Sequence, residues 1–222
     1  EADIQFHEYL DYFKHDDNTN VVIAYVEGFS RGLDFIKKIE EFVRHKALII
    51  YKTGRTQAGK NAAISHTGAL AGNYNVASEV MRQAGAIVIE QSDLILPVAS
   101  ALASCPFAAG GRVAILTDGG GQGTIAADAL VERGLSLPAL SAETANKLKS
   151  ILPVTASLNN PVDVGGAADQ FPGVLSECAG ILLKDSATDA LLIVGLFGGY
   201  HHRFSSELLG AELDAFKALR EH

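Results

Sequence analysis

Short apolar runs alternate with stretches of helical periodicity along the first hundred residues. Residues 5–14 and 31–44 repeat apolar side chains at the three- and four-residue spacing of amphipathic helices. Unbroken apolar runs at 21–26 and 47–51 are typical of strands that are buried on both faces. The remaining elements expected in this half are a helix over 73–84, a strand over 87–89, and a helix from an N-cap at Ser92 to about Ala103.

The pattern stops at Cys105-Pro106 and then restarts. An apolar strand at 113–117 runs into a glycine-rich turn, after which 123–133 has helical periodicity. The remaining expected elements are a helix capped by Ser141 and ending near Leu152, a short strand at 161–164, a helix at 171–184, a strand at 191–196, and a helix from about Ser205.

Strands that alternate with helices of this length form βαβ units and parallel sheets. The sequence therefore predicts two flavodoxin-like α/β domains with parallel sheets, at about 1–105 and 110–222. Open parallel sheets bind ligands at the carboxyl ends of their strands, so the residues that directly follow each strand are the first candidates for function.

Glycine is in excess, with 22 residues among 222, and it gathers directly after the strand-like runs. Backbone that turns sharply or approaches a ligand closely needs glycine, so both halves are expected to present ligand loops. Phosphate is a natural ligand where such a loop opens a helix. The glycine groups are Glu27-Gly28, Gly119-Gly120-Gly121-Gln122-Gly123, Gly165-Gly166 and Gly198-Gly199.

The composition argues against several classes of binding partner and site. Eighteen basic against 26 acidic residues give a formal charge of −8, which argues against nucleic acid and against an anionic membrane surface. Two cysteines, Cys105 and Cys178, exclude a disulfide framework and a cysteine-based zinc site, and they favour a cytoplasmic setting. The absence of an initiating Met before Glu1 suggests a piece of a longer protein.

The strongest local feature is His66 within the run from Ser65 to Gly72, in a stretch from Thr53 that is rich in Gly, Ala, Ser and Thr. Because small residues surround the imidazole, His66 is expected in an accessible loop. A partly neutral imidazole there can attack phosphorus and hold it as a phosphoramidate. Chemistry alone favours the plainer alternative, a histidine that hydrogen-bonds loop backbone.

The motif resembles the NDP-forming acyl-CoA synthetases, which include succinyl-CoA synthetase and the ADP-forming acetyl-CoA synthetases. The resemblance spans nearly the whole chain in the family's order. The matching stretches are Gly54-Arg55-Thr56-Gln57-Ala58-Gly59, Ala62-Ala63, Ser65-His66-Thr67-Gly68-Ala69-Leu70-Ala71-Gly72, Gln83-Ala84-Gly85, the helix from Asp93, residues 115–123, 126–130, Leu152-Pro153, and Asn160-Pro161-Val162-Asp163.

The resemblance implies a phosphoryl relay. An acyl-CoA and phosphate give an acyl phosphate, His66 takes the phosphoryl group, and a mobile segment delivers it to a nucleoside diphosphate. Glu27 matches the glutamate that orients the histidine, because a carboxylate on one ring nitrogen leaves the other free to attack. Without the resemblance, Glu27 would be read as a solvated carboxylate at a strand end.

The glycine turns supply the other candidate contacts. The resemblance implies phosphate binding by Gly119, Gly120, Gly121, Gln122 and Gly123, at a helix start whose free N–H groups suit an anion. Asp118 stands where the family usually has Asn, and Gln122 where it has Pro, so Asp118 is not expected to touch the phosphate. Gly198 and Gly199 resemble a loop near the acyl substrate, and this interpretation is only slightly favoured over a tight turn before a helix. No metal site is expected, since adjacent His201 and His202 would point to opposite sides.

Two ligand signatures are missing. No G-x-G-x-x-G follows an early strand and no Walker-type loop occurs. In the family, a Rossmann-like domain holds CoA and an ATP-grasp domain or subunit holds the nucleotide. The resemblance therefore implies CoA, ATP/ADP and Mg²⁺ as substrates of a full enzyme, a short-chain carboxylic acid or acyl-CoA, and association with other subunits or copies. The 222 residues alone are expected to fold but to make no acyl-CoA.

Two other functions stay open. Related domains are fused to acetyltransferase domains in protein lysine acetyltransferases, where they form a ligand-sensing regulatory module without turnover. A flavodoxin-like module that binds a phosphate-containing ligand without chemistry is the third possibility. The neighbouring domains and a search for a phosphoenzyme would separate the three.

Overall fold

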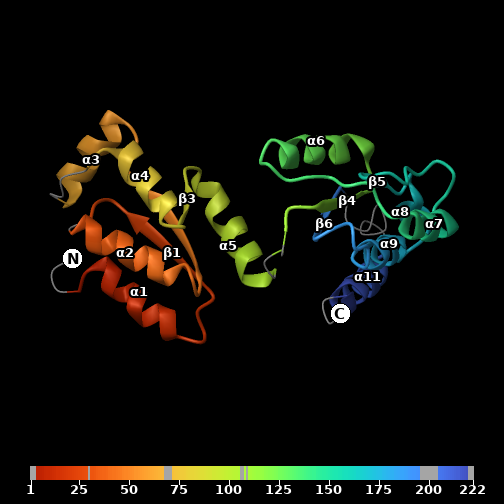
Figure 1. Ribbon diagram of the computed structural model, residues 1–222, viewed down its shortest axis with the longest axis horizontal. Helices are drawn as coiled ribbons and strands as arrows, with labels where there is room; N and C mark the ends of the chain where they lie inside the picture. The colour runs from red at the N-terminus through yellow and green to blue at the C-terminus, as the bar shows by residue number, and fades with distance from the viewer. Residues whose placement is uncertain are drawn as a thin grey trace. The chain divides into compact units, whose positions relative to one another are not determined.

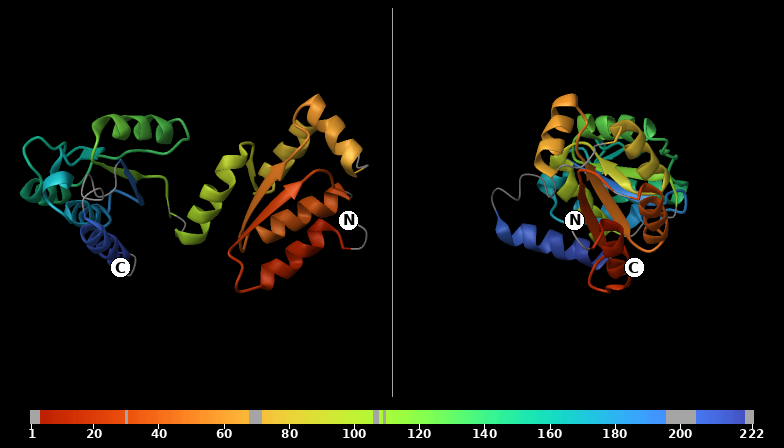
Figure 2. Two further views of the ribbon diagram at one scale, coloured as in Figure 1. Left: turned by 180° about the vertical axis from the view of Figure 1, so that it is seen from behind. Right: turned by 90° about the vertical axis from the view of Figure 1, so that its left-hand side faces the viewer.

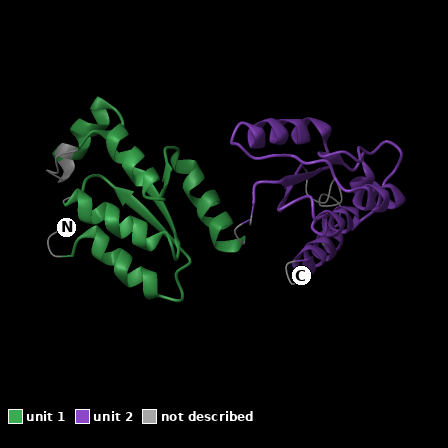
Figure 3. Ribbon diagram, in the orientation of Figure 1, with its two compact units in different colours: residues 1–107 green, residues 108–222 purple. Residues whose placement is uncertain are grey.

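The computed structural model describes residues 4–29, 31–67, 72–105, 108, 110–195 and 205–219. The chain divides into two compact units, residues 1–107 and 108–222 (Figure 3). Each unit builds its own three-stranded sheet, and all strand pairs in both sheets are parallel. The prediction of two parallel-sheet α/β domains is confirmed.

The first unit has the strand order β1-β2-β3, with β2 in the centre. Val21 pairs with Ala47 at the start of β1, and Val26 pairs with Lys52 at its end. The elements in chain order are α1 (Phe6–His15), β1 (Val21–Val26), α2 (Gly32–Phe42), β2 (Ala47–Lys52), α3 (Gln57–Thr67), α4 (Tyr74–Gln83), β3 (Ile87–Ile89), a 3₁₀ turn η1 (Ser92–Leu94) and α5 (Ile95–Ser104) (Figure 1).

One face of this sheet makes the core of the first unit. Alternate residues of β1 and β2 point to the same face, where α1, α2 and α4 cover them. Figure 2 shows α1 and α2 side by side along the sheet. The buried set is Leu10, Ala24, Val26, Phe35, Ile39, Phe42, Leu48, Ile50, Met81, Ala84 and Ala86.

The second unit has the order β5-β4-β6, so here its first strand in the chain, β4, is in the centre. Its sheet is small because β5 spans two residues. The elements are β4 (Val113–Thr117), α6 (Gly120–Val131), α7 (Ala142–Ile151), β5 (Val162–Asp163), α8 (Ala167–Gln170), α9 (Val174–Leu182), β6 (Ala190–Val194) and α11 (Ser206–Ala218).

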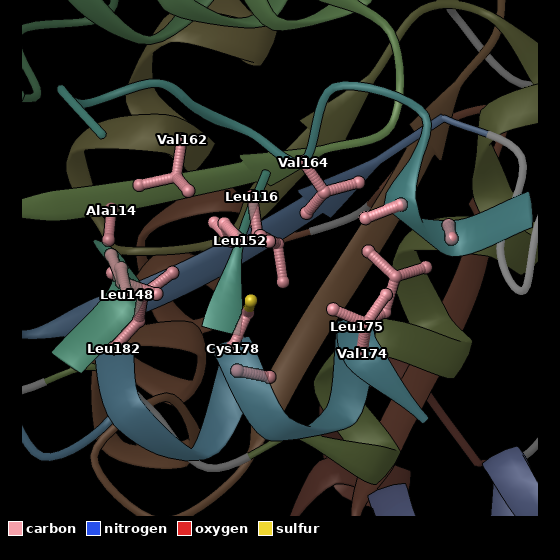
Figure 4. Packing of buried hydrophobic residues seen from close by; sticks show 13 residues of the cluster. Ala114, Leu116, Leu148, Leu152, Val162, Val164, Val174, Leu175, Cys178 and Leu182 are labelled. Carbon is pink, nitrogen blue, oxygen red and sulfur yellow. The ribbon is translucent and has the colours of Figure 1, made fainter. Parts of the chain in front are cut away.

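Helices α7 and α9 bury one face of the second sheet. Figure 4 shows Leu148, Val174, Leu175, Cys178 and Leu182 gathered against the strand residues Ala114, Leu116 and Val162. The sulfur of Cys178 points from α9 into this cluster, and burial raises the pKa of its thiol to about 12. Cys178 is therefore a core residue, whereas Cys105 is exposed, and both are free thiols.

Three expected helices differ in extent. The glycines expected as a turn before residue 123 form the first turn of α6, because glycine accepts helical dihedrals and Gly119 stays extended as the N-cap. The helix expected over 171–184 begins only at Val174 and ends at Leu182, since Pro172 and a left-handed Gly173 precede it; the short α8 lies before the expected range. Ser92 opens a 3₁₀ turn, and α5 begins only at Ile95.

The predicted cap at Ser141 is confirmed. Its hydroxyl accepts a hydrogen bond from the backbone N–H of Thr144 at 3.1 Å, which satisfies one of the free donors at the start of α7. Ser205 caps α11 in the same way, with its hydroxyl accepting from the N–H of Leu208 at 3.2 Å.

Candidate functional site

The carboxyl ends of β1 and β2 bring Glu27 and Thr53 next to each other. The strands are in register to their last residues, Val26 and Lys52, and the N–H of Thr53 then donates to the Val26 carbonyl at 3.1 Å. Glu27 follows β1 directly, so it leaves the sheet at the edge where parallel sheets bind ligands.

A hollow of about 680 Å³ lies at this edge. The strand ends form one wall and α3 forms the other, and Figure 1 places α3 at this end of the sheet. The α3 side chains that the structure describes in this wall are small. The lining residues are Tyr25, Glu27, Thr53, Gly54, Gly59, Ala62, Ala63 and Ser65.

His66 lies in the last turn of α3, directly after Ser65. The expectation of an open loop at this position is wrong for the backbone, because Gln57, Ala58, Lys60, Ala62 and Ala63 favour a helix. The hydroxyl of Ser65 bonds back to the carbonyls of the preceding turn at 2.9 and 3.0 Å. The side chain of His66 and residues 68–71 lie outside the described part of the chain, so the orientation of the imidazole stays a prediction.

Glu27 is half-buried and lines the hollow together with Ser65, the neighbour of His66. Its backbone carbonyl accepts a hydrogen bond from the ammonium of Lys52 at 2.6 Å. The hydroxyl oxygen of Thr53 is buried and has no hydrogen-bond partner within the described residues. The wall formed by the strand ends thus contributes the carboxylate-bearing residue Glu27, whereas the hydroxyl oxygen of Thr53 is enclosed by protein.

Lys52 is a residue of this site that the sequence analysis missed. It ends an apolar strand, and its side chain is only 5% exposed. The sequence did contain a signal for Lys52, because it is a charged residue at the end of an otherwise apolar strand. Burial lowers the pKa of the Lys52 ammonium, the charge of Glu27 opposes this shift, and the charge of Lys60 adds to it.

The glycine cluster of the second unit lies at the carboxyl end of β4. Gly119 is the N-cap of α6, and it exchanges two hydrogen bonds with the hydroxyl of Thr117 at 3.0 and 3.1 Å. Gly120 to Gly123 form the first helical turn. The N–H groups of Gln122 and Gly123 already donate to the Gly119 carbonyl, so Gly120 and Gly121 supply the remaining donors at the positive end of the helix dipole.

Carboxylates crowd this helix start. A methyl group on Gly120 would stand 3.0 Å from Asp163 Oδ2, while Asp163 Oδ1 accepts the N–H of Gly165 at 2.9 Å. Asp118 lies against the α-carbon of Gly195, which has a left-handed φ of 123°. These charges complement the dipole of α6 but oppose a second anion, so the phosphate contact of Gly119–Gly123 stays a prediction.

Several expected residues fall outside the described part of the chain. Gly198, Gly199, His201 and His202 are among them. Among the residues that the structure does describe, no group of three or more His, Cys, Asp or Glu side chains is arranged to hold a metal ion. In the same residues, every helix is too short or too polar to cross a lipid bilayer.

Two family models match the chain, one in each unit. Residues 1–102 match the succinyl-CoA ligase like flavodoxin domain. Residues 113–216 match the Ligase-CoA domain. The flavodoxin-like character predicted for the fold is thereby confirmed.

Curated relatives extend the match beyond single domains. The chain is 37% identical to the ADP-forming acetate–CoA ligase I of Archaeoglobus fulgidus over 84% of this chain, and it spans 27% of that protein. It is 34% identical to the alpha subunit of the ADP-forming acetate–CoA ligase II of Pyrococcus furiosus, over 87% of this chain and 42% of the subunit. The chain thus spans less than half the length of these relatives.

A solved structure agrees with the sequence matches. The dinucleotide-forming acetyl-coenzyme A synthetase 1 of Ca. Korarchaeum cryptofilum, in complex with phosphate and ADP, superposes with a TM-score of 0.83. It is 28% identical to this chain, and the match covers 98% of this chain and 47% of that one.

Proposed function

Since the chain belongs to the family of NDP-forming acyl-CoA synthetases, we propose that it is the phosphoryl-carrying part of an ADP-forming acyl-CoA ligase. The full reaction is acid, CoA and ATP to acyl-CoA, ADP and phosphate, and it is reversible. The relatives named as acetate–CoA ligases support a short-chain acid as substrate.

His66 is the proposed carrier. In the direction of ATP synthesis, phosphate displaces CoA from the acyl-CoA to give an acyl phosphate. A ring nitrogen of His66 then attacks phosphorus, the P–O bond to the acyl group breaks, and the carboxylate leaves. ADP next takes the phosphoryl group from the P–N bond and restores the neutral imidazole.

Glu27 is the proposed partner of His66. The single observation that carries the proposal is the shared hollow. Glu27 lines it directly after β1, and Ser65 lines it from the turn of α3 that contains His66. A carboxylate on one imidazole nitrogen fixes the tautomer, leaves the other nitrogen free to attack, and stabilises the cation that phosphorylation creates.

The second unit is proposed to hold a phosphoryl group at the start of α6, through Gly119, Gly120, Gly121, Gln122 and Gly123. The N–H groups of Gly120 and Gly121 at the start of the helix support this role. Asp163 and Asp118 count against a permanently bound anion and favour transient contact during transfer. Gly198 and Gly199 are proposed to approach the acyl substrate.

The remaining substrates are proposed to bind mainly outside this chain. CoA would be held by a Rossmann-like domain, and ATP or ADP with Mg²⁺ by an ATP-grasp domain or subunit. A relative that is itself named as an alpha subunit supports a partner subunit. The relatives named above are ligases, and none of them supports a regulatory module of a lysine acetyltransferase.

Phosphorylation of the full-length protein tests the carrier role. The protein is incubated with ATP and Mg²⁺, quenched at alkaline pH because phosphohistidine is labile to acid, and digested for mass spectrometry. We expect phosphate on the peptide that contains His66. His66→Asn should remove both the phosphopeptide and acyl-CoA formation.

His45→Asn is the matched control, because His45 is an exposed histidine of the same unit, located between α2 and β2. It should leave the phosphopeptide and the activity unchanged. Acyl-CoA formation that survives His66→Asn would rule the mechanism out. Calorimetry on the 222 residues alone should show negligible binding of ATP or ADP, and micromolar binding would place a nucleotide site inside this chain.

A further inference from the structure

Two lysines bind backbone carbonyls at opposite ends of β2. Lys46 precedes the strand, and its ammonium donates to the carbonyl of Phe13 at 2.7 Å and to that of Asp16, at the end of α1. Lys52 ends the strand and donates to the carbonyl of Glu27 at 2.6 Å and to that of Thr53 at 2.8 Å. The two contacts have the same chemistry, but only the second reaches the edge with the hollow.

The ammonium of Lys52 joins the two chain segments just beyond the paired strands. At the end of the paired strands β1 and β2, the N–H of Thr53 donates a hydrogen bond to the carbonyl of Val26. Beyond that point, Lys52 bridges the carbonyls of Glu27 and Thr53. The direction in which Glu27 leaves β1 is therefore set by a side chain of the neighbouring strand.

Keeping a charge at this position is costly. Lys52 is only 5% exposed, and a buried ammonium is tolerated only when it is paired. The two carbonyls provide hydrogen bonds, and the nearby Glu27 provides the opposite charge. Methionine would fill the same space without the cost of burying a charge, so the lysine at this strand end suggests a role beyond packing.

We propose that Lys52 is a positioning residue for phosphoryl transfer: its ammonium ties Glu27 to the end of β2 and so holds the Glu27 carboxylate at the hollow beside α3. Lys52 does not line the hollow, and it acts through Glu27. This inference rests on the roles proposed for His66 and Glu27.

A double-mutant cycle on the full-length protein tests the inference. The rate of His66 phosphorylation from ATP is measured for Lys52→Met, Glu27→Gln and the double variant, with each rate normalised to folded protein. Lys52→Met should slow phosphorylation by about 10- to 100-fold, as small displacements of a catalytic group do, with the KM for ATP unchanged. Lys52→Arg, which keeps charge and donors, should restore most of the rate.

The double variant separates positioning from packing. If Lys52 acts through Glu27, the double variant should be no slower than Glu27→Gln alone, because the two residues share one effect. Lys46→Met is the matched control, since it loses the same two kinds of hydrogen bond at the other end of β2. It should lower the thermal midpoint yet leave the phosphorylation rate of the folded protein unchanged.

Two results would overturn the role of Lys52. One is multiplicative slowing in the double variant, and the other is equal slowing by Lys46→Met and Lys52→Met. Should Lys52→Met fail to fold, Lys52→Gln, which keeps a donor and loses the charge, takes its place in the cycle. Failure of the wild-type protein to phosphorylate His66 would instead reject the proposed function.

Discussion

The residues at the carboxyl ends of the strands are arranged differently in the two units. In the first unit, the ends of β1 and β2 face a hollow that is lined from α3 by small described residues such as Gly59, Ala62 and Ala63. In the second unit, polar side chains at or after the strand ends lie close to the α-carbons of two glycines. Asp118 and Gln122 would obstruct a methyl group on Gly195, and Asp163 would crowd one on Gly120.

This difference shows that a parallel sheet supplies a location for a ligand but not the ligand itself. The residues after each strand decide what that location can hold. A half-buried carboxylate beside open space suits an imidazole that must be oriented and then charged. Carboxylates packed against a helix start suit the helix dipole, and they leave an anion only a transient place.

Gly195→Ala should have the largest effect on stability, because polar side chains of the second unit leave no room for a methyl group at this position. The φ of 123° is unfavourable for any residue with a Cβ, and the new methyl group would collide with Asp118. We expect a loss of about 2–4 kcal/mol in the free energy of unfolding of the second unit, measured with denaturant. Adding Asp118→Ala to Gly195→Ala should remove the collision but leave the backbone strain. Full stability of Gly195→Ala alone would contradict the packing described for this edge.

Replacement of Asp185 in the second unit should have an intermediate effect that depends on pH. Burial by itself raises the pKa of Asp185, but the backbone N–H groups of Ala187 and Ser141 and nearby hydroxyls lower it below its usual 3.8. A lowered pKa in the folded state stabilises the protein above pH 3.8, and this contribution is lost as the pH falls below that value.

Asp185→Asn should therefore cost about 1–2 kcal/mol at pH 7 and flatten the acid side of the stability curve of the second unit. Denaturant unfolding across the pH range measures both effects. Lys147→Met, which removes only the exposed ion pair with Glu143, should change stability by less than about 0.5 kcal/mol. An acid limb that keeps its slope in Asp185→Asn would contradict this assignment.

Gly59→Ala should have the smallest effect and the opposite sign to Gly195→Ala. Gly59 lies inside α3, where a methyl group would meet Thr56 Oγ1 at 3.4 Å and the α-carbon of Gly54 at 3.7 Å, both ordinary contacts. Alanine should stabilise the first unit by about 0.5–1 kcal/mol, because glycine costs more entropy in a helix. Thermal unfolding measures the gain, and a loss would mean that this edge is as tightly packed as the other.

Local sequence patterns were sufficient for most of the strands. The apolar runs at 21–26, 87–89 and 113–117 coincide with β1, β3 and β4. Only β4 is buried throughout; Ile23 and Tyr25 of β1 are exposed, so the expectation that β1 is buried on both faces is wrong. The side-chain cap at Ser141 was readable as well, whereas the expectation that Ser92 is an N-cap was wrong. Helix extents were not readable where glycine is frequent, because glycine fits both the turn and the first turn of α6.

The sequence alone determined the fold class, the family resemblance and the candidates His66 and Glu27, since motif and periodicity are local properties of the chain. Tertiary structure decided which distant residues meet. It joined Glu27 to α3 across one hollow, and it revealed that Lys52 holds Glu27 from the neighbouring strand. It also brought Asp118 against Gly195, 77 positions further along the chain, which no local pattern could indicate. Contacts between residues so far apart arise only when the strands pair, because strand register places their ends at one edge.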